Sequence, residues 1–255
     1  MILLRRRRGE RLLVCDNGKM AKHIGIVACS AEGAALCYRT ICEEGDRQLG
    51  GYRHPEITMH THALGEYMPF VDAGDWQGVA GLVLSSAGKL AKAGAEFLIC
   101  PDNTVHIAFE MFAPKSPLPW LHIAEEVAAE AKRRGFRKLA LTGTRYTMEG
   151  PVYPKKLAER DIECLSPSES DRRRINEIIF EELVKGVFTA AARSEFHRII
   201  NRMMEGGCDA VILACTEIPL LIDDATSPLP TLDSTRILAR AALERALAIP
   251  AGDVL

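Results

Sequence analysis

The sequence predicts an α/β protein built from parallel sheets that are covered by helices on both faces. Strand-like and helix-like segments alternate along the chain, and glycines such as Gly94 and Gly135 stand where predicted helices end. Several strand-like segments are short apolar runs, as expected of parallel strands buried on both faces. Ligands of such sheets bind beyond the carboxyl ends of the strands. The residues that directly follow each strand are therefore the first candidates for a site.

The clearest strand is the apolar run 23–29, and Ser30 after it is a suitable N-cap for a helix. In segment 55–61, Ile57 and Met59 alternate with polar residues, which also indicates a strand. Further strands are predicted at 97–100, 138–142, 162–164, 209–214 and 230–233. Apolar residues at helical spacing predict helices over 30–42, 75–92, 121–134, 151–160, 170–185, 190–204 and 234–247. The proline-rich segment 114–120 is predicted to be a loop that lines a subunit interface or covers a cleft.

Two segments resemble each other at a fixed offset, 94–104 and 207–217. Each has a glycine, an acidic residue, an apolar strand and then a reactive side chain, so that Asp102 falls opposite Cys215. This internal repeat predicts two pseudo-symmetric α/β domains that face each other across a cleft.

We assign residues 21–115 together with 225–255 to the first domain, and 116–224 to the second. Residues 1–20, which include four consecutive arginines, are predicted to be a disordered extension.

Three motifs resemble those of the aspartate/glutamate racemase family, and the resemblance extends over residues 22–247. The segment 209–222, which contains Cys215-Thr216-Glu217, is similar to the second cysteine motif of that family. The other two are Thr142-Gly143-Thr144 followed by Thr147-Met148, and Asp233-Ser234-Thr235 before the last predicted helix.

The resemblance implies a two-domain, often dimeric enzyme that uses neither pyridoxal phosphate nor a metal. Two cysteines on opposite faces of the substrate would exchange a proton at its α-carbon. This chain departs from that pattern, because it has Asp102-Asn103-Thr104 where such racemases usually have Cys-Asn-Thr. Cys100 would point to the same face as Asp102 but ~6–7 Å further back along the strand. The opening motif also differs, with Cys29-Ser30 where family members often have Gly-Met-Ser.

We therefore predict Cys215 and Asp102 as the acid/base pair of an asymmetric site. The side chains predicted to bind the substrate's α-carboxylate and its surroundings are Ser30, Asn103, Thr104, Thr144, Thr147, Thr216 and Glu217. Arg53 and Arg193 are candidates for bidentate contacts with a second carboxylate, although surface positions are the ordinary alternative for arginine.

Several alternatives stay open at this point. Asp102 has the residue type of a helix N-cap and can serve both purposes. His106 is either a structural histidine or a residue that supports the site. His60 and His62 share a strand face and are metal ligands, substrate contacts or surface residues; no suitably spaced partner supports a metal.

The bulk composition gives no case for a nucleic-acid or membrane partner. The formal net charge of the 255 residues is -2, and no apolar run reaches the ~18–20 residues that span a bilayer. The 8 cysteines show no metal-binding spacing, and buried free thiols are the default in the cytoplasm, where we expect this protein.

The sequence thus predicts a cofactor-independent amino-acid racemase or epimerase-like isomerase that acts on a small carboxylate such as aspartate or glutamate. The resemblance further implies a homodimer. The alternatives are a decarboxylase or cis–trans isomerase of a malonate- or maleate-like diacid, or a non-catalytic relative that binds a ligand in the same cleft.

Overall fold

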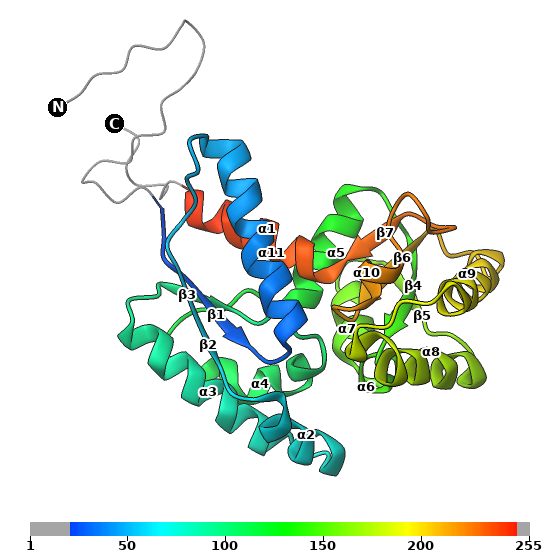
Figure 1. Cartoon of the computed structure of the whole chain (residues 1–255), viewed down its shortest axis with the longest axis horizontal. Helices are drawn as coiled ribbons and strands as arrows, with labels where there is room; N and C mark the ends of the chain where they lie inside the picture. Colours follow the sequence, from blue (N-terminus) through cyan, green and yellow to red (C-terminus); the bar gives the residue numbers. More distant parts are fainter. Residues whose placement is uncertain (1–20, 249–255) are drawn as a thin grey trace, which may run out of the picture.

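The computed structural model describes residues 21–248, which form two lobes, each built on a parallel sheet (Figure 1). The first sheet has the order β2-β1-β3, and the second β5-β4-β6-β7. The strands are β1 (Ile24–Ala28), β2 (Ile57–Thr61), β3 (Phe97–Ile99), β4 (Lys138–Gly143), β5 (Glu163–Leu165), β6 (Ala210–Ala214) and β7 (Thr231–Asp233). All seven coincide with predicted strands, and every pairing is parallel, so the predicted α/β class is confirmed.

The first sheet is covered on both faces. One face packs on α1 (Ala31–Leu49) and α11 (Ser234–Leu247), with Ile24 and Ile26 in the shared core. The other face, with Val27 and Leu98, packs on α2 (Leu64–Ala73), α3 (Trp76–Lys92) and the short helices after β3. Those short helices are η1 (Thr104–Ala108), α4 (Phe109–Phe112) and η2 (Ala113–Lys115).

The second sheet lies within one continuous apolar core. Its helices are α5 (Ile123–Arg133), α6 (Arg145–Glu149), α7 (Val152–Ala158), α8 (Glu169–Glu181), η3 (Leu183–Lys185), α9 (Ala190–Glu205) and α10 (Ile218–Leu221). Among residues 21–248, no helix combines the length and the apolar character that a membrane span needs.

The two repeated segments occupy equivalent places in the two sheets. Strand β3 lies next to the central strand β1, and β6 lies next to the central strand β4. The residues that follow β3 and β6 therefore emerge at the carboxyl ends of matching strands.

The last elements of the described chain connect the two lobes. Strand β7 pairs with β6 in the second sheet, whereas α11 directly after it packs along α1 of the first lobe (Figure 1). The predicted division of the chain into domains stays a prediction, and it has β7 in the first domain although the strand belongs to the second sheet. The predicted extension 1–20 lies outside the described residues.

The segment 114–120, predicted to be a loop, extends the first sheet. The backbone N–H of Leu98 donates to the carbonyl of Pro119, and the N–H of Leu121 donates to the carbonyl of Leu98. This segment covers the edge of β3 that β1 leaves open, and none of its residues lines the pocket described below.

Candidate active site

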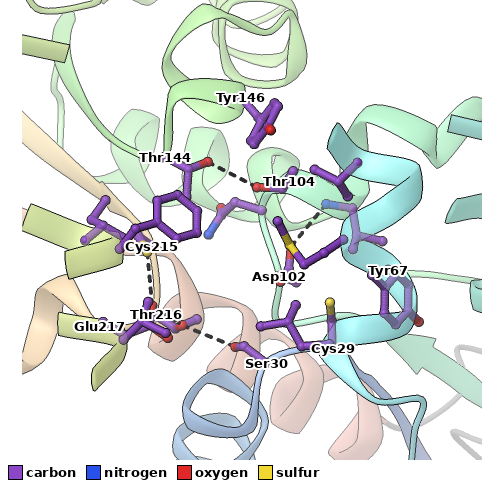
Figure 2. Close-up of a pocket in the computed structure, with 18 of the residues that line it drawn as sticks. Cys29, Ser30, Tyr67, Asp102, Thr104, Thr144, Tyr146, Cys215, Thr216 and Glu217 are labelled. Atoms are coloured by element: carbon purple, nitrogen blue, oxygen red, sulfur yellow. Dashed lines mark hydrogen bonds between the residues drawn. The ribbon is translucent and has the colours of Figure 1, made fainter. Parts of the chain in front are cut away.

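A pocket of about 90 Å³ lies where the carboxyl ends of the two sheets face each other (Figure 2). This small volume suits a ligand of amino-acid size better than a drug-sized molecule. Its lining comes from both lobes, with Cys29 and Asp102 from the first and Thr144 and Cys215 from the second. The two residues predicted as an acid/base pair thus border the same cavity.

Asp102 lies three residues beyond the end of β3, and its carboxylate is bound to the backbone that follows it. The N–H of Val105 donates to Oδ1 of Asp102 at 3.1 Å, at the start of η1. Burial raises the pKa of Asp102, and the Val105 N–H and the Cys29 thiol offset part of the effect. Asp102 therefore both accepts a backbone hydrogen bond and lines the pocket.

Cys215 follows β6, and its side chain is coupled to Glu217. Its Sγ donates to Oε2 of Glu217 at 3.0 Å, and Oγ1 of Thr216 donates to the same oxygen at 2.8 Å. Burial, followed by the negative charge of Glu217, raises the pKa of Cys215 well above its usual value. Cys215 is consequently a thiol at neutral pH when no ligand is bound.

Cys29 is a pocket residue that the sequence analysis did not assign to the site. It follows β1 and precedes Ser30, the N-cap of α1. Burial and then the charge of Asp102 raise the pKa of this thiol, so it is protonated at neutral pH. Its position after a buried parallel strand was the signal that sequence reasoning could have used.

Hydroxyl groups connect the two lobes around the pocket (Figure 2). Oγ1 of Thr104 lies 3.2 Å from Oγ1 of Thr144, which in turn lies 3.2 Å from Oγ1 of Thr147. On the other side, Oγ of Ser30 lies 3.4 Å from Oγ1 of Thr216. Thr147 stands behind Thr144 rather than in the lining, so it positions that hydroxyl.

Asn103 lines the pocket, but its side chain is tied to the protein. The hydroxyl of Tyr153 donates to Oδ1 of Asn103 at 2.5 Å, and Nδ2 of Asn103 donates to Oγ of Ser234 at 3.1 Å. Ser234 in turn donates to the carbonyl of Leu213 at the end of β6. The side chain of Asn103 thus fixes the loop that carries Asp102, which explains why Asp233-Ser234-Thr235 belongs to the pattern noted in the sequence.

The structure does not bring Arg53 or Arg193 to the pocket, in contrast to the prediction. Arg53 is exposed and donates to the carbonyls of Leu49 and Gly50 at the end of α1. Arg193 lies on α9 and donates to the carbonyl of Leu221. Both guanidinium groups donate to backbone carbonyls at helix ends, and neither lines the pocket, so neither is placed to bind a substrate carboxylate there.

The histidines singled out in the sequence have structural partners. Nδ1 of His106 bonds to the carbonyl of Asp102, while Nε2 accepts from the N–H of Ile123, and burial lowers the pKa of His106 to about 3. His60 and His62 bond to serines of α3 and lie outside the pocket lining. Within residues 21–248, no group of three or more His, Cys, Asp or Glu side chains has an arrangement that could hold a metal ion.

Sequence reasoning also missed the apolar wall of the pocket. It is formed by residues of α2 and by residues of α8 and the turn after it: Leu64, Tyr67, Met68, Val71, Ile179, Phe180 and Val184. The region of α2 had no element assigned to it, although Leu64, Met68 and Val71 have the spacing of one helix face.

Residues 26–242 match the protein family described as Asp/Glu/Hydantoin racemase. The chain belongs to this racemase family. The match begins within β1 and ends within α11, and so includes the residues after each strand that line the pocket.

Similar proteins agree with this family membership. The chain is 35% identical to a candidate Asp/Glu racemase of Yersinia pestis of known structure, covering 89% of this chain and 100% of that one with a TM-score of 0.83. It is 30% identical to an aspartate racemase homologue of Pyrococcus horikoshii, covering 88% and 98% with a TM-score of 0.77. It is also 26% identical, over 65% of this chain and 71% of the relative, to the broad-specificity amino-acid racemase RacX of Bacillus subtilis.

Proposed function

We propose that this protein is a cofactor-independent racemase or epimerase that exchanges a proton at the α-carbon of a small carboxylate substrate. The observation that carries the proposal is the pair Asp102 and Cys215, which follow matching strands of the two sheets and line one pocket from opposite lobes. Inversion at carbon needs a base on one face and an acid on the other, and this arrangement supplies both.

The protonation states assign the roles. Cys215 is a thiol whose ionisation is opposed by burial and by Glu217, so it donates a proton. The Asp102 carboxylate, whose pKa is raised by burial, is a stronger base than an exposed aspartate and accepts the α-proton. After one turnover Asp102 is protonated and Cys215 is a thiolate, which is the starting state for the reverse reaction.

The two directions are not equivalent in this site. A Cys215 thiolate lies beside the Glu217 carboxylate, and repulsion between the two favours its return to the thiol. In the resting site, the transferable proton is therefore on the Cys215 thiol, and Asp102 is a carboxylate. In this proposal, the substrate carboxylate and the negative charge that develops on it are bound by pocket hydroxyl groups, those of Ser30, Thr104, Thr144 and Thr216.

Incubation with a broad panel of L- and D-amino acids in D2O, followed by NMR of the α-proton, tests the proposal. We expect α-proton exchange with part of the panel, and loss of at least about 100-fold of the rate in Cys215→Ala. Cys208→Ala, which changes a buried thiol outside the pocket, is the matched control and should keep the rate. No exchange with any substrate, or full activity of Cys215→Ala, contradicts the proposal.

The asymmetry of the pair favours one second candidate, a decarboxylase or cis–trans isomerase of a malonate- or maleate-like diacid. Such a reaction needs proton delivery from one side only, which a Cys215 thiol can supply. Release of CO2 from a disubstituted malonate, or isomerisation of maleate, distinguishes it from racemisation. The homodimer implied by the resemblance stays a prediction that light scattering tests.

A further inference from the structure

The lining of the pocket has a polar part, called the polar end below, and an apolar part. At the polar end, hydroxyl groups follow the strands of both sheets, with Ser30 and Thr104 from one lobe and Thr144 and Thr216 from the other. These groups suffice for one carboxylate. The class of substrate is then determined by what the rest of the pocket accepts.

The apolar part of the lining, called the apolar end below, is formed by residues of two helical regions, one from each lobe. Leu64, Met68 and Val71 lie on α2, and Ile179, Phe180 and Val184 come from α8 and η3. The α2 residues follow each other at four and three positions, which places them on one side of the helix. Figure 2 shows Tyr67 of α2 on the same side of the pocket as Asp102 and Cys29, with Cys215 opposite.

The charges of the lining are all negative. It contains Asp102 and Glu217, and it contains no lysine, arginine or histidine. The two arginines that sequence reasoning offered as ligands for a second carboxylate are bound to backbone carbonyls elsewhere. A second carboxylate would thus lose its hydration against apolar side chains without any cation to replace it. By contrast, the single ammonium group of an amino acid is favoured by the acidic lining.

On the basis of the proposed function, we propose that the substrate is an α-amino acid with one carboxylate and an apolar side chain, of the leucine, methionine or phenylalanine class. The side chain packs between α2 and α8, and the carboxylate is held at the strand ends. Aspartate and glutamate, the substrates that the resemblance implies, are rejected at the apolar end.

Two measurements on the full-length protein test this specificity. The first is α-proton exchange in D2O with leucine, methionine and phenylalanine against aspartate and glutamate, and we expect kcat/KM to be at least about 100-fold higher for the apolar group. The second is ligand-induced change of Tm, which reports binding without turnover. Millimolar leucine or methionine should raise Tm, whereas aspartate and glutamate should leave it unchanged.

A matched pair of variants locates the effect. Met68→Arg puts a cation at the apolar end, and we expect it to lower the preference for leucine over glutamate at least tenfold. Met204→Arg changes an exposed methionine on α9, outside the pocket lining, and should keep the wild-type preference.

The outcomes separate this inference from the proposed function. Exchange of aspartate or glutamate as fast as that of leucine overturns the inference while the racemase proposal stands. Binding of apolar amino acids without exchange of any amino acid supports the inference and contradicts the racemase proposal. If apolar amino acids show neither binding nor exchange, the inference is wrong, and unchanged specificity in Met68→Arg also counts against it.

Discussion

Gly33 in the first turn of α1 lies close to Thr216 of the second lobe, and its replacement by alanine tests the geometry of the site. An added Cβ would lie 2.5 Å from Cγ2 of Thr216, 2.8 Å from the carbonyl oxygen of Pro101 and 2.9 Å from Oγ of Ser30. Ordinary contacts begin near 3.4 Å, so these neighbours must move by about 0.5–0.9 Å. Pro101 directly precedes Asp102, and Thr216 directly follows Cys215, so the movement reaches both proposed acid/base groups.

We expect Gly33→Ala to lower the free energy of unfolding by about 1–3 kcal/mol, the usual cost of overpacking a closely packed region. Because a displacement of about 1 Å commonly costs about 100-fold in rate, we expect a loss of that order in α-proton exchange. Urea unfolding and the NMR exchange assay measure the two effects separately.

Gly81→Ala is the matched control. Gly81 also lies within a helix, but an added Cβ there meets no atom within 4 Å. This variant should gain about 0.5–1 kcal/mol from helix propensity and keep full activity. If Gly33→Ala is as stable and as active as Gly81→Ala, the close approach of the lobes at this point is refuted.

Three further variants test individual contacts of the site. Asp102→Asn should abolish α-proton exchange yet raise the free energy of unfolding at neutral pH, and asparagine keeps the acceptor for the N–H of Val105. The reason is that a carboxyl whose pKa is raised in the folded state destabilises the fold as pH rises from about 3.9 through that pKa. Urea unfolding of the variant and the wild type at pH 3 and pH 7 checks this, and a variant that is destabilised equally at both pH values contradicts it. Glu217→Gln removes a negative charge that raises the pKa of Cys215, so alkylation of this thiol by iodoacetamide should become faster at fixed pH. Mass spectrometry follows the alkylation, and an unchanged rate shows that Glu217 does not control the pKa of the thiol. Tyr146→Phe removes the 2.9 Å hydrogen bond to Asp72 that joins the lobes beside the pocket, so KM should rise several-fold with kcat unchanged. Steady-state kinetics measure both constants, and a fall in kcat alone would refute a role of this bond in closing the pocket.

The fold was predictable because burial leaves a strong pattern in the sequence. All seven strands are apolar or alternating runs, and each predicted strand coincides with an observed one. Helix α2 was missed because Gly65 and Pro69 lie within its ten residues, and both weaken a helical pattern. The four- and five-residue helices α10 and α6 are too short to show a period.

The site was predictable where chemistry follows a strand, as for Asp102 and Cys215, because the sheet determines where strand ends lie. It was not predictable for Arg53 and Arg193, which were chosen for their charge without any constraint on their place. Their guanidinium groups bond to backbone carbonyls near the ends of α1 and α10, an alternative that the chemistry of arginine alone does not exclude.

The crossing of the chain from β7 to α11 makes the pocket sensitive to the last helix of the described chain. Ser234, at the junction, bonds to Leu213 of β6 and receives the side chain of Asn103, the neighbour of Asp102. Local unfolding of α11 would therefore uncover α1 and release the loop that carries Asp102, while the core of the second sheet stays packed. Loss of activity should thus precede global denaturation, and limited proteolysis within α11 should inactivate the protein without cutting any residue that lines the pocket.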